Sequence, residues 1–291
     1  MSSVHVLGNP SARDGRAQLD EVLEACRRRG VDAVAIEADT VADARAATAG
    51  VVADGTSRLI AVGGDGVVHI AVNAVAETET VLGVVPLGTG NDFARALELL
   101  AGSVDEQVDR ALADASPVDA IRSDHGWIAS VATLGFSGDV TARANGLAWP
   151  RGSARYTVAT LLQLQRLRTL PVALEVEGRQ IGDATTLLAV GNTAYFGGGM
   201  RICPSASPDD GLLQAVSIGD VPRHRFVRVF PTVFSGGHVD RPEVSTATGS
   251  WATIDGPEDI DVWADGERLG PLPIRLDVVA GAVLVAGFGL L

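Results

Sequence analysis

The sequence predicts two domains, a doubly wound parallel α/β domain followed by a domain built from antiparallel strands. In the first part of the chain, short apolar runs alternate with segments whose apolar residues recur at helical spacing. This is the pattern of a parallel sheet with helices on both faces. Near Pro117 the pattern changes to closely spaced strand-like runs with few helices, which is typical of a two-layer antiparallel sandwich. At 291 residues, the chain is long enough to bury two hydrophobic cores.

The first domain is expected to alternate strands and helices. Its first helix is marked by Leu19, Val22, Leu23 and Cys26, which fall on one helical face, and by Gly30, which ends it. The apolar runs are short and uninterrupted, as in strands that are buried on both faces. The strands are expected at residues 4–7, 31–36, 58–62 and 81–85, and the helices at residues 13–29, 43–52, 92–99 and 104–113.

The second domain is expected to be rich in strands. Its short apolar runs are separated by segments with glycine, proline, asparagine or aspartate, which favour turns. The strands are expected at residues 128–134, 171–176, 186–190, 212–218, 260–264, 274–279 and 283–288, and the helices at residues 137–147, 153–167 and 223–230.

Two glycine-rich loops directly follow two strands of the first domain. They are Gly63-Gly64-Asp65-Gly66 and Pro86-Leu87-Gly88-Thr89-Gly90-Asn91-Asp92. A glycine loop between a parallel strand and the next helix is where α/β sheets bind phosphate, because missing Cβ atoms let backbone N–H groups approach the anion. We therefore predict that both loops bind the phosphates of a nucleotide.

Each loop also carries an acid, Asp65 in the first and Asp92 in the second. Carboxylates repel phosphate unless a hard cation lies between them, so the pairing predicts Mg²⁺. Thr89 and Asn91 are expected to donate side-chain hydrogen bonds to phosphate oxygens. The structural alternative is that Asp65 caps its own helix, and that Asn91 and Asp92 form a capping turn.

Four further segments stand in a fixed order around these loops. They are Gly8-Asn9-Pro10 with Ser11, then Gly191-Asn192 followed by Gly197-Gly198-Gly199-Met200 and Pro204-Ser205-Ala206, then Asp210-Gly211-Leu212, and finally Asp265-Gly266-Glu267. Taken in order with the two loops, they resemble the diacylglycerol kinase catalytic family, especially its bacterial soluble lipid kinases. The resemblance runs from about residue 4 to the end of the chain.

The resemblance implies a lipid kinase that uses ATP and Mg²⁺ to phosphorylate a diacylglycerol-like alcohol, giving phosphatidate. It also implies that the last strand returns to the first domain. The nucleotide-binding α/β domain would then comprise residues 1–118 with 282–291, and residues 119–281 would form the β-rich domain for the lipid substrate.

The resemblance also assigns roles to individual residues. Asp265 is implied as the general base, with Glu267 in support, and Asp65 as a catalytic acid of the Mg²⁺ network. The implied nucleotide-binding residues are Asn9, Pro10, Arg13, Arg16, Gly63, Gly64, Asp65, Gly66, Gly88, Thr89, Gly90 and Asn91. The implied metal-binding residues are Asp65, Asp92 and Asp119 in the active site, and Asp210 with the Leu212 carbonyl in a structural site.

The sequence leaves other functions open. NAD kinases share the GGDG loop and a two-domain plan, but the PLGTGND loop and the order of the later motifs fit lipid kinases better. The family usually has Thr and Glu where this chain has Val67 and Ile70. These departures leave open a non-catalytic pseudokinase that binds nucleotide or lipid. By itself, Asp265-Gly266 is also an ordinary hairpin turn signal.

The bulk composition limits the partners. The net charge of −13 argues against a general nucleic-acid binder. Cys26 and Cys203 lack metal-ligand spacing. Without a leader or an apolar run of membrane-spanning length, we expect a cytoplasmic protein that meets its lipid substrate at the membrane surface, at most peripherally. Arginines near the helix expected at residues 153–167 would make that contact, and a homodimer is left open. These arginines are Arg151, Arg155, Arg166 and Arg168.

Overall fold

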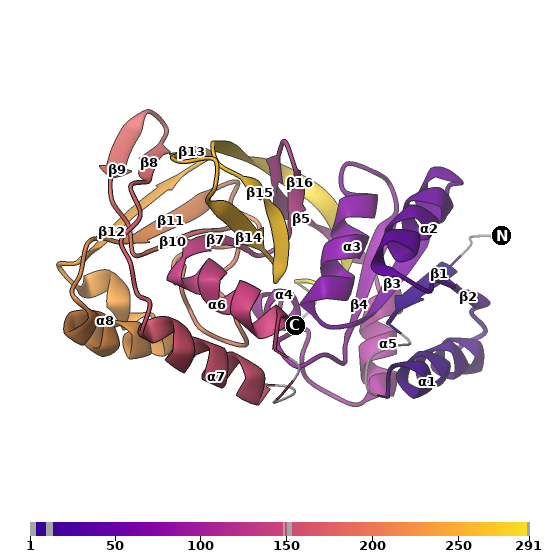
Figure 1. Cartoon of the computed structure of the whole chain (residues 1–291). Coiled ribbons are helices and arrows are strands. Elements are labelled where there is room, and N and C mark those ends of the chain that lie inside the picture. Colours follow the sequence, from indigo (N-terminus) through magenta and orange to yellow (C-terminus); the bar gives the residue numbers. More distant parts are fainter. Residues whose placement is uncertain (1–3, 10–13, 148, 150–152, 290–291) are drawn as a thin grey trace. The chain divides into compact units, whose positions relative to one another are not determined.

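The computed structural model describes residues 4–9, 14–147, 149 and 153–289 (Figure 1). The chain divides into two compact units. Unit 1 comprises Met1–Ala120 with Val279–Leu291, and unit 2 comprises Ile121–Val278. Both boundaries fall inside continuous strands, β5 (Ala115–Ser123) and β16 (Ile274–Ala286). No flexible linker therefore marks them in the sequence.

Unit 1 contains a parallel sheet in the order β2, β1, β3, β4. The end of β16 continues this sheet, because Leu284 pairs with Val81 in parallel. The expected return of the last strand to the first domain is therefore confirmed. The separate strands expected at 274–279 and 283–288 are in fact one strand, which runs through the small residues between them. The four parallel strands are β1 (Val4–Gly8), β2 (Ala33–Ala35), β3 (Arg58–Gly63) and β4 (Val81–Pro86).

Helices cover both faces of this sheet, as in a doubly wound fold (Figure 1). On one face, α1 (Gly15–Arg28) and α5 (Val104–Leu112) share a core with the strands. On the other, α2 (Val41–Ala53) packs against α3 (Asp65–Val75). The remaining helix of unit 1, α4 (Asp92–Ala96), is shorter than the helix expected at residues 92–99. It ends early because Glu98 takes a left-handed conformation with φ 61°.

Unit 2 contains a six-stranded antiparallel sheet that faces a second layer of strands. The six strands are β12 (Val244–Gly249), β11 (Leu213–Ile218), β10 (Leu187–Gly191), β7 (Val131–Gly135), β14 (Asp261–Ala264) and β15 (Glu267–Pro271). The second layer comprises β6 (Gly126–Ile128), β8 (Ala173–Val176), β9 (Arg179–Gly182), β13 (Trp251–Asp255) and the unit 2 parts of β5 and β16. The expected antiparallel sandwich is confirmed.

Alternation along β10 shows how the six-stranded sheet is covered on both faces. Leu188 and Val190 join the core between the two sheets, whereas Leu187 and Ala189 join a second core. Helices enclose this second core, so unit 2 has a third, helical layer beyond the two that the sequence predicted (Figure 1). They are α6 (Phe136–Asn145), α7 (Ser153–Leu164), α8 (Arg223–Val229) and the 3₁₀ segments η1 (Phe230–Ser235) and η2 (Gly237–Asp240).

Candidate phosphate-binding and catalytic site

The first glycine loop joins β3 to α3. Gly63 has φ 149°, and Gly64 is the N-cap of α3. The backbone N–H groups of Val67 and Val68 donate to Gly64 O at 3.0 and 3.2 Å. The N–H groups before them have no carbonyl one turn earlier in the helix, and the helix dipole makes this end positive. The loop therefore has the geometry of a phosphate site.

The second glycine loop joins β4 to α4, and the side chain of Asn91 holds it closed. Asn91 Oδ1 accepts from Gly88 N at 3.1 Å, while Nδ2 donates to Pro86 O at 3.2 Å and to Gly88 O at 3.0 Å. Both amide hydrogens are used inside the loop. The amide of Asn91 therefore shapes the loop, and its expected contact with phosphate stays a prediction. Thr89 is exposed at the loop tip, where its hydroxyl can meet a ligand.

The two loops pack against each other backbone to backbone. A Cβ added at Gly88 would lie 2.3 Å from Gly64 Cα and 2.7 Å from Gly64 N. Asp65 Oδ1 also joins the loops, because it accepts from Asp92 N at 2.7 Å and from Phe93 N at 3.3 Å. Asp65 therefore caps α4, while the N-cap position of its own helix α3 is occupied by Gly64. The two predicted phosphate loops form one joined structure.

The carboxylates of Asp65 and Asp92 belong to this joined structure and could meet a magnesium ion. Mg²⁺ commonly takes one or two carboxylates, with water and phosphate oxygens as its other ligands. Asp92 is buried, with Arg95 Nε 4.0 Å from its Oδ1. Among the described residues, the structure gathers no group of three or more His, Cys, Asp or Glu side chains around a metal position. Two carboxylates beside a phosphate loop fit Mg²⁺ bound together with a nucleotide.

The third acid expected in this network has a structural partner. Asp119 is buried on β5, and its Oδ1 accepts from Gly281 N in β16 at 2.8 Å. This bond ties together the strands that carry the chain into and out of unit 2. The role of Asp119 as a metal ligand stays a prediction.

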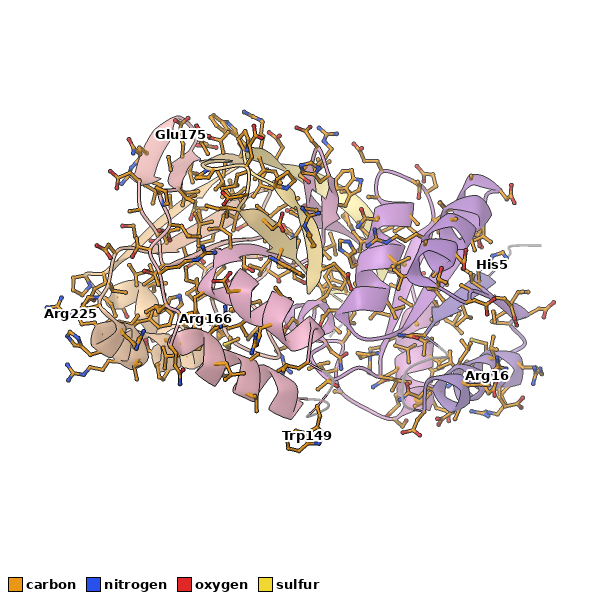
Figure 2. All side chains as sticks on the ribbon, viewed as in Figure 1. His5, Arg16, Trp149, Arg166, Glu175 and Arg225 are labelled. Carbon is orange, nitrogen blue, oxygen red and sulfur yellow. The ribbon has the colours of Figure 1, made fainter. Side chains whose placement is uncertain are left out.

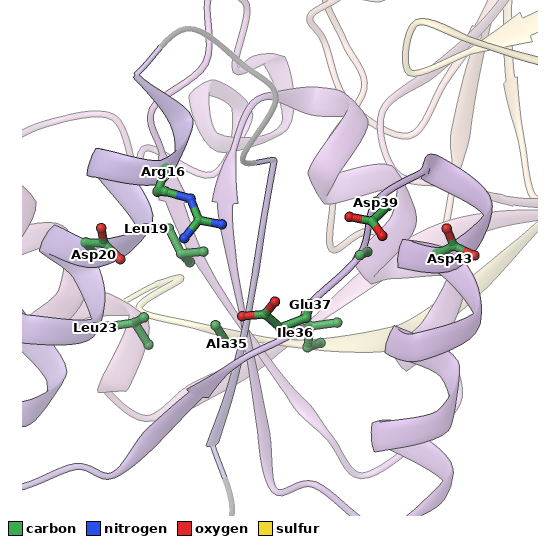
Figure 3. A pocket seen from close by; sticks show the side chains of 10 residues that line it. Arg16, Leu19, Asp20, Leu23, Ala35, Ile36, Glu37, Asp39 and Asp43 are labelled. Atoms are coloured by element: carbon green, nitrogen blue, oxygen red, sulfur yellow. The ribbon is translucent and has the colours of Figure 1, made fainter.

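Unit 1 also has a cavity of about 410 Å³ between α1, the end of β2 and the start of α2 (Figure 3). Arg16, expected to bind nucleotide, lies at this cavity together with the carboxylates of Glu37 and Asp39 (Figure 3). In dinucleotide-binding members of the doubly wound fold, an acid after the second strand binds a ribose hydroxyl. Sequence reasoning missed Glu37 and Asp39, although their position after the second strand was a usable signal. Asn9 is exposed at the end of β1, and Pro10 and Arg13 lie outside the described residues.

In unit 2, Asp265 and Gly266 form a tight turn between β14 and β15. Their φ angles of 51° and 89° are those of a hairpin turn that favours Asp-Gly. The Asp265 carboxylate also accepts two backbone N–H groups, from Ala129 to Oδ2 and from Ser130 to Oδ1, both at 2.9 Å. These bonds lie where β6 ends and β7 begins, within the single strand expected at 128–134. Asp265 is therefore both a turn residue and a held carboxylate.

The end of β10 meets the same backbone segment. Ser130 O accepts from Asn192 N at 2.9 Å and from Thr193 N at 3.3 Å. The Gly191-Asn192 motif and the Asp265 motif therefore meet at Ser130. Glu267 is half-buried at the start of β15.

The structure shows only local contacts at the remaining predicted sites. Asp210 is exposed, and its Oδ1 accepts from Leu212 N at 2.9 Å in a local turn, so the structural metal site stays a prediction. Of the arginines expected at the membrane, Arg166 and Arg168 are exposed. Arg168 Nη2 lies 3.6 Å from Asp139 Oδ1. Arg151 and the side chain of Arg155 lie outside the described residues. Over the described part of the chain, no helix has the length and apolar character needed to cross a membrane.

Comparison with known proteins covers nearly the whole chain. Residues 3–123 match the diacylglycerol kinase catalytic domain, and residues 129–287 match the YegS C-terminal NAD kinase beta sandwich-like domain. The diacylglycerol kinase of Mycobacterium tuberculosis (strain ATCC 25618 / H37Rv) is 37% identical over 98% of this chain and 95% of its own length. Lipid kinase YegS of Escherichia coli (strain K12) is 30% identical over 79% of this chain and 77% of its own.

A solved structure agrees with the fold. The crystal structure of a diacylglycerol kinase from Bacillus anthracis str. Sterne superposes with a TM-score of 0.72 at 19% identity, covering 98% of this chain and 96% of that one. At this level of identity, the likeness establishes the architecture alone.

Proposed function

The chain belongs to the family of diacylglycerol kinases and YegS-like lipid kinases, and from this premise we propose that it transfers the γ-phosphoryl group of ATP to the hydroxyl of a diacylglycerol-like lipid, giving phosphatidate. The observation that carries the proposal is the joined pair of glycine loops. Gly64 and Gly88 touch backbone to backbone, and Asp65 fixes the second loop through two amides. Phosphoryl transfer needs this kind of fixed, positively polarised cradle more than it needs covalent chemistry.

Each unit has a distinct part in the proposed reaction. In unit 1, backbone N–H groups at the start of α3 hold phosphate oxygens, while Arg16, Glu37 and Asp39 bind the nucleoside part. Bound Mg²⁺, held by Asp65 and Asp92, would supply charge neutralisation for the phosphates. In unit 2, Asp265 accepts the proton of the lipid hydroxyl as that oxygen attacks phosphorus. Its two backbone hydrogen bonds fix the direction of its carboxylate.

A pseudokinase is the second candidate, because Val67 and Ile70 replace the polar residues usual in the family. A Cβ at Gly63 would lie 2.8 Å from Val67 Cγ2, so this apolar side chain lies directly over the first glycine loop. Such a protein would bind nucleotide without turnover. The NAD kinase alternative is disfavoured, because the relatives that match along both units are named diacylglycerol kinase and lipid kinase.

Nucleotide binding is tested with Asp65→Asn, because this change removes the carboxylate charge and can keep the hydrogen bonds that cap α4. Asparagine keeps an Oδ1 that can accept from Asp92 N and Phe93 N, but it removes the negative charge. We expect calorimetry with ATP·Mg²⁺ to give a clear signal for the wild type and a much weaker one for the variant, while the ligand-free melting temperatures stay close. Asp65→Ala, which also removes the cap of α4, should lower the melting temperature as well. Absence of any ATP·Mg²⁺ signal at millimolar levels in the wild type would overturn the proposal.

A further inference from the structure

A basic stretch interrupts this acidic chain in unit 2. Between Asp220 and Asp240 the sequence holds three arginines, two histidines and no acid, although the whole chain carries a net charge of −13. This stretch contains α8 and η1. This segment is therefore locally basic within an acidic chain.

The structure turns the basic side chains of this segment outward. Phe226, Val229 and Val233 are buried in the helical core of unit 2. The outer side carries exposed Arg223, His224, Arg225 and Arg228. It also carries two large apolar side chains, Val227 at 46% exposed and Phe234 at 60% exposed. We call this outer side of α8 and η1 the basic face.

The arginines of the basic face are only partly neutralised. Arg225 Nη1 lies 3.4 Å from Glu243 Oε1, and Arg223 Nη2 donates to Gln165 O, an uncharged carbonyl, at 2.6 Å. Within the described residues, Arg228 has no ion pair. Arg166 follows Gln165 directly and is also exposed, which extends the positive charge toward the end of α7 (Figure 2).

We propose that the basic face docks on an anionic lipid bilayer, an inference that rests on the proposed function because it supplies the surface on which a lipid substrate is met. Charge complementarity identifies the partner. Exposed arginines attract the headgroups of anionic lipids, and exposed apolar side chains between them enter the boundary of the acyl chains. A cluster of positive charges can attract an anionic bilayer even when the protein as a whole is acidic. Salt screens the repulsion from acidic residues that lie more than about 10 Å away.

The first test measures binding to vesicles without any turnover. Wild-type protein should sediment with vesicles that contain phosphatidylglycerol, bind phosphatidylcholine vesicles weakly, and detach as salt is raised. The variant Arg223→Gln/Arg225→Gln/Arg228→Gln should bind the anionic vesicles at least roughly tenfold more weakly. Phe234→Ser should weaken binding without changing its salt dependence. The control Arg27→Gln/Arg28→Gln/Arg45→Gln removes the same charge from exposed helical positions in unit 1 and should bind like wild type.

Two results would overturn the proposal. One is equal vesicle binding by the basic-face variant and the control. The other is concentration-dependent self-association that the basic-face variant alone abolishes, which would make this face a contact between copies of the chain.

The second test separates docking from chemistry. A short-chain diacylglycerol dissolved in solution needs no bilayer, so the basic-face variant should phosphorylate it like wild type. The same variant should lose activity on diacylglycerol embedded in anionic vesicles. Equal loss on both substrates would contradict docking. A wild type that binds vesicles but phosphorylates neither substrate would contradict the proposed function and leave the docking surface intact.

Discussion

At the scale of single residues, the two most important carboxylates both hold backbone that is distant in the sequence. Asp65 accepts the amides that open α4, and Asp265 accepts the amides of Ala129 and Ser130. Each acid therefore fixes the place of a neighbouring segment, and that segment fixes the direction of the acid in return. A catalytic carboxylate gains from this arrangement because its orientation is set before substrate binds.

This double use changes what Asp265→Asn is expected to do. Asparagine forms the turn equally well, but it has one acceptor oxygen where Asp265 uses two, and its NH₂ group would face a backbone N–H. We expect a loss of stability of about 1–3 kcal/mol from the unpaired amide. The loss of a positioned base should also reduce kcat by about 10²- to 10⁴-fold.

The two effects are separated by measuring kcat, ATP affinity and melting temperature together. A purely architectural role predicts that kcat recovers well below the melting temperature of the variant. A role in chemistry predicts that the loss persists there, with ATP affinity little changed. A folded variant with normal kcat would remove Asp265 from the proposed reaction.

The burial of His238 predicts that the stability of the protein depends on pH. Its side chain is fully buried, Nε2 lies 3.0 Å from Ile202 O, and burial lowers its pKa below the usual value. The unfolded chain therefore binds a proton in a pH range where the folded chain does not. Its contribution is complete above the unfolded pKa, about 6.5, and is lost as pH falls below it.

His238→Gln, which keeps a donor for Ile202 O, should flatten the fall in melting temperature between pH 7 and pH 5. The same change at the exposed His224 serves as the control. An unchanged slope in His238→Gln would show that other groups cause the acid sensitivity.

At the scale of elements, the proposed nucleotide binding depends on two strand–loop–helix units that pack loop to loop. Gly88→Ala should separate them, because its Cβ would meet backbone atoms of Gly64, which cannot rotate away. We expect a lower melting temperature and a marked loss of ATP affinity. Gly50→Ala is the matched control, since a Cβ there meets open space on α2 and should stabilise the protein by about 0.5–1 kcal/mol. Normal ATP affinity in Gly88→Ala would mean that the contact between the loops is not needed.

Helix α3, which follows the first glycine loop, allows a test of the pseudokinase alternative. Val67 and Ile70 are half-buried on the first turns of α3. If they only slow a working site, Val67→Thr with Ile70→Glu should raise turnover of labelled ATP, and each single change should have a smaller effect. No detectable change would favour a pseudokinase. A fall in activity accompanied by a lower melting temperature would show that the helix is packed around Ile70, where a carboxylate is costly to bury.

Sequence reasoning predicted the buried elements well and the half-exposed ones poorly. β3 and β4 of unit 1 and β10 and β11 of unit 2 are buried along most of their length, so they appear as continuous apolar runs. It missed β9, β12, β13 and β15, most of whose residues are partly or fully exposed and many of which are polar. The glycine loops were found because they follow buried strands. The contact between Asp265 and Ala129 spans 136 residues and leaves no pattern in the sequence.

At the scale of the whole molecule, two compact units divide the proposed work. Unit 1 carries the phosphate loops and the acid-lined cavity, while unit 2 carries Asp265 and the basic face. Family membership, expected from the order of the motifs, is confirmed by matches along almost the full length of the chain. The antiparallel sandwich, expected from the strand-rich pattern after Pro117, is confirmed by the sheet topology. The identity of the lipid could not be predicted, since apolar residues that line a lipid site leave no distinctive pattern.

The most direct test of the central claim follows the labelled γ-phosphoryl group. The protein is incubated with γ-labelled ATP·Mg²⁺ and a panel of lipid alcohols that includes diacylglycerol and sphingosine, with NAD as a separate acceptor and Asp65→Asn as the control protein. We predict label in phosphatidate when diacylglycerol is present, no labelled NADP, and a sharp reduction with the variant. Label in NADP, or none in any lipid although ATP binds, would contradict a lipid kinase that acts on diacylglycerol.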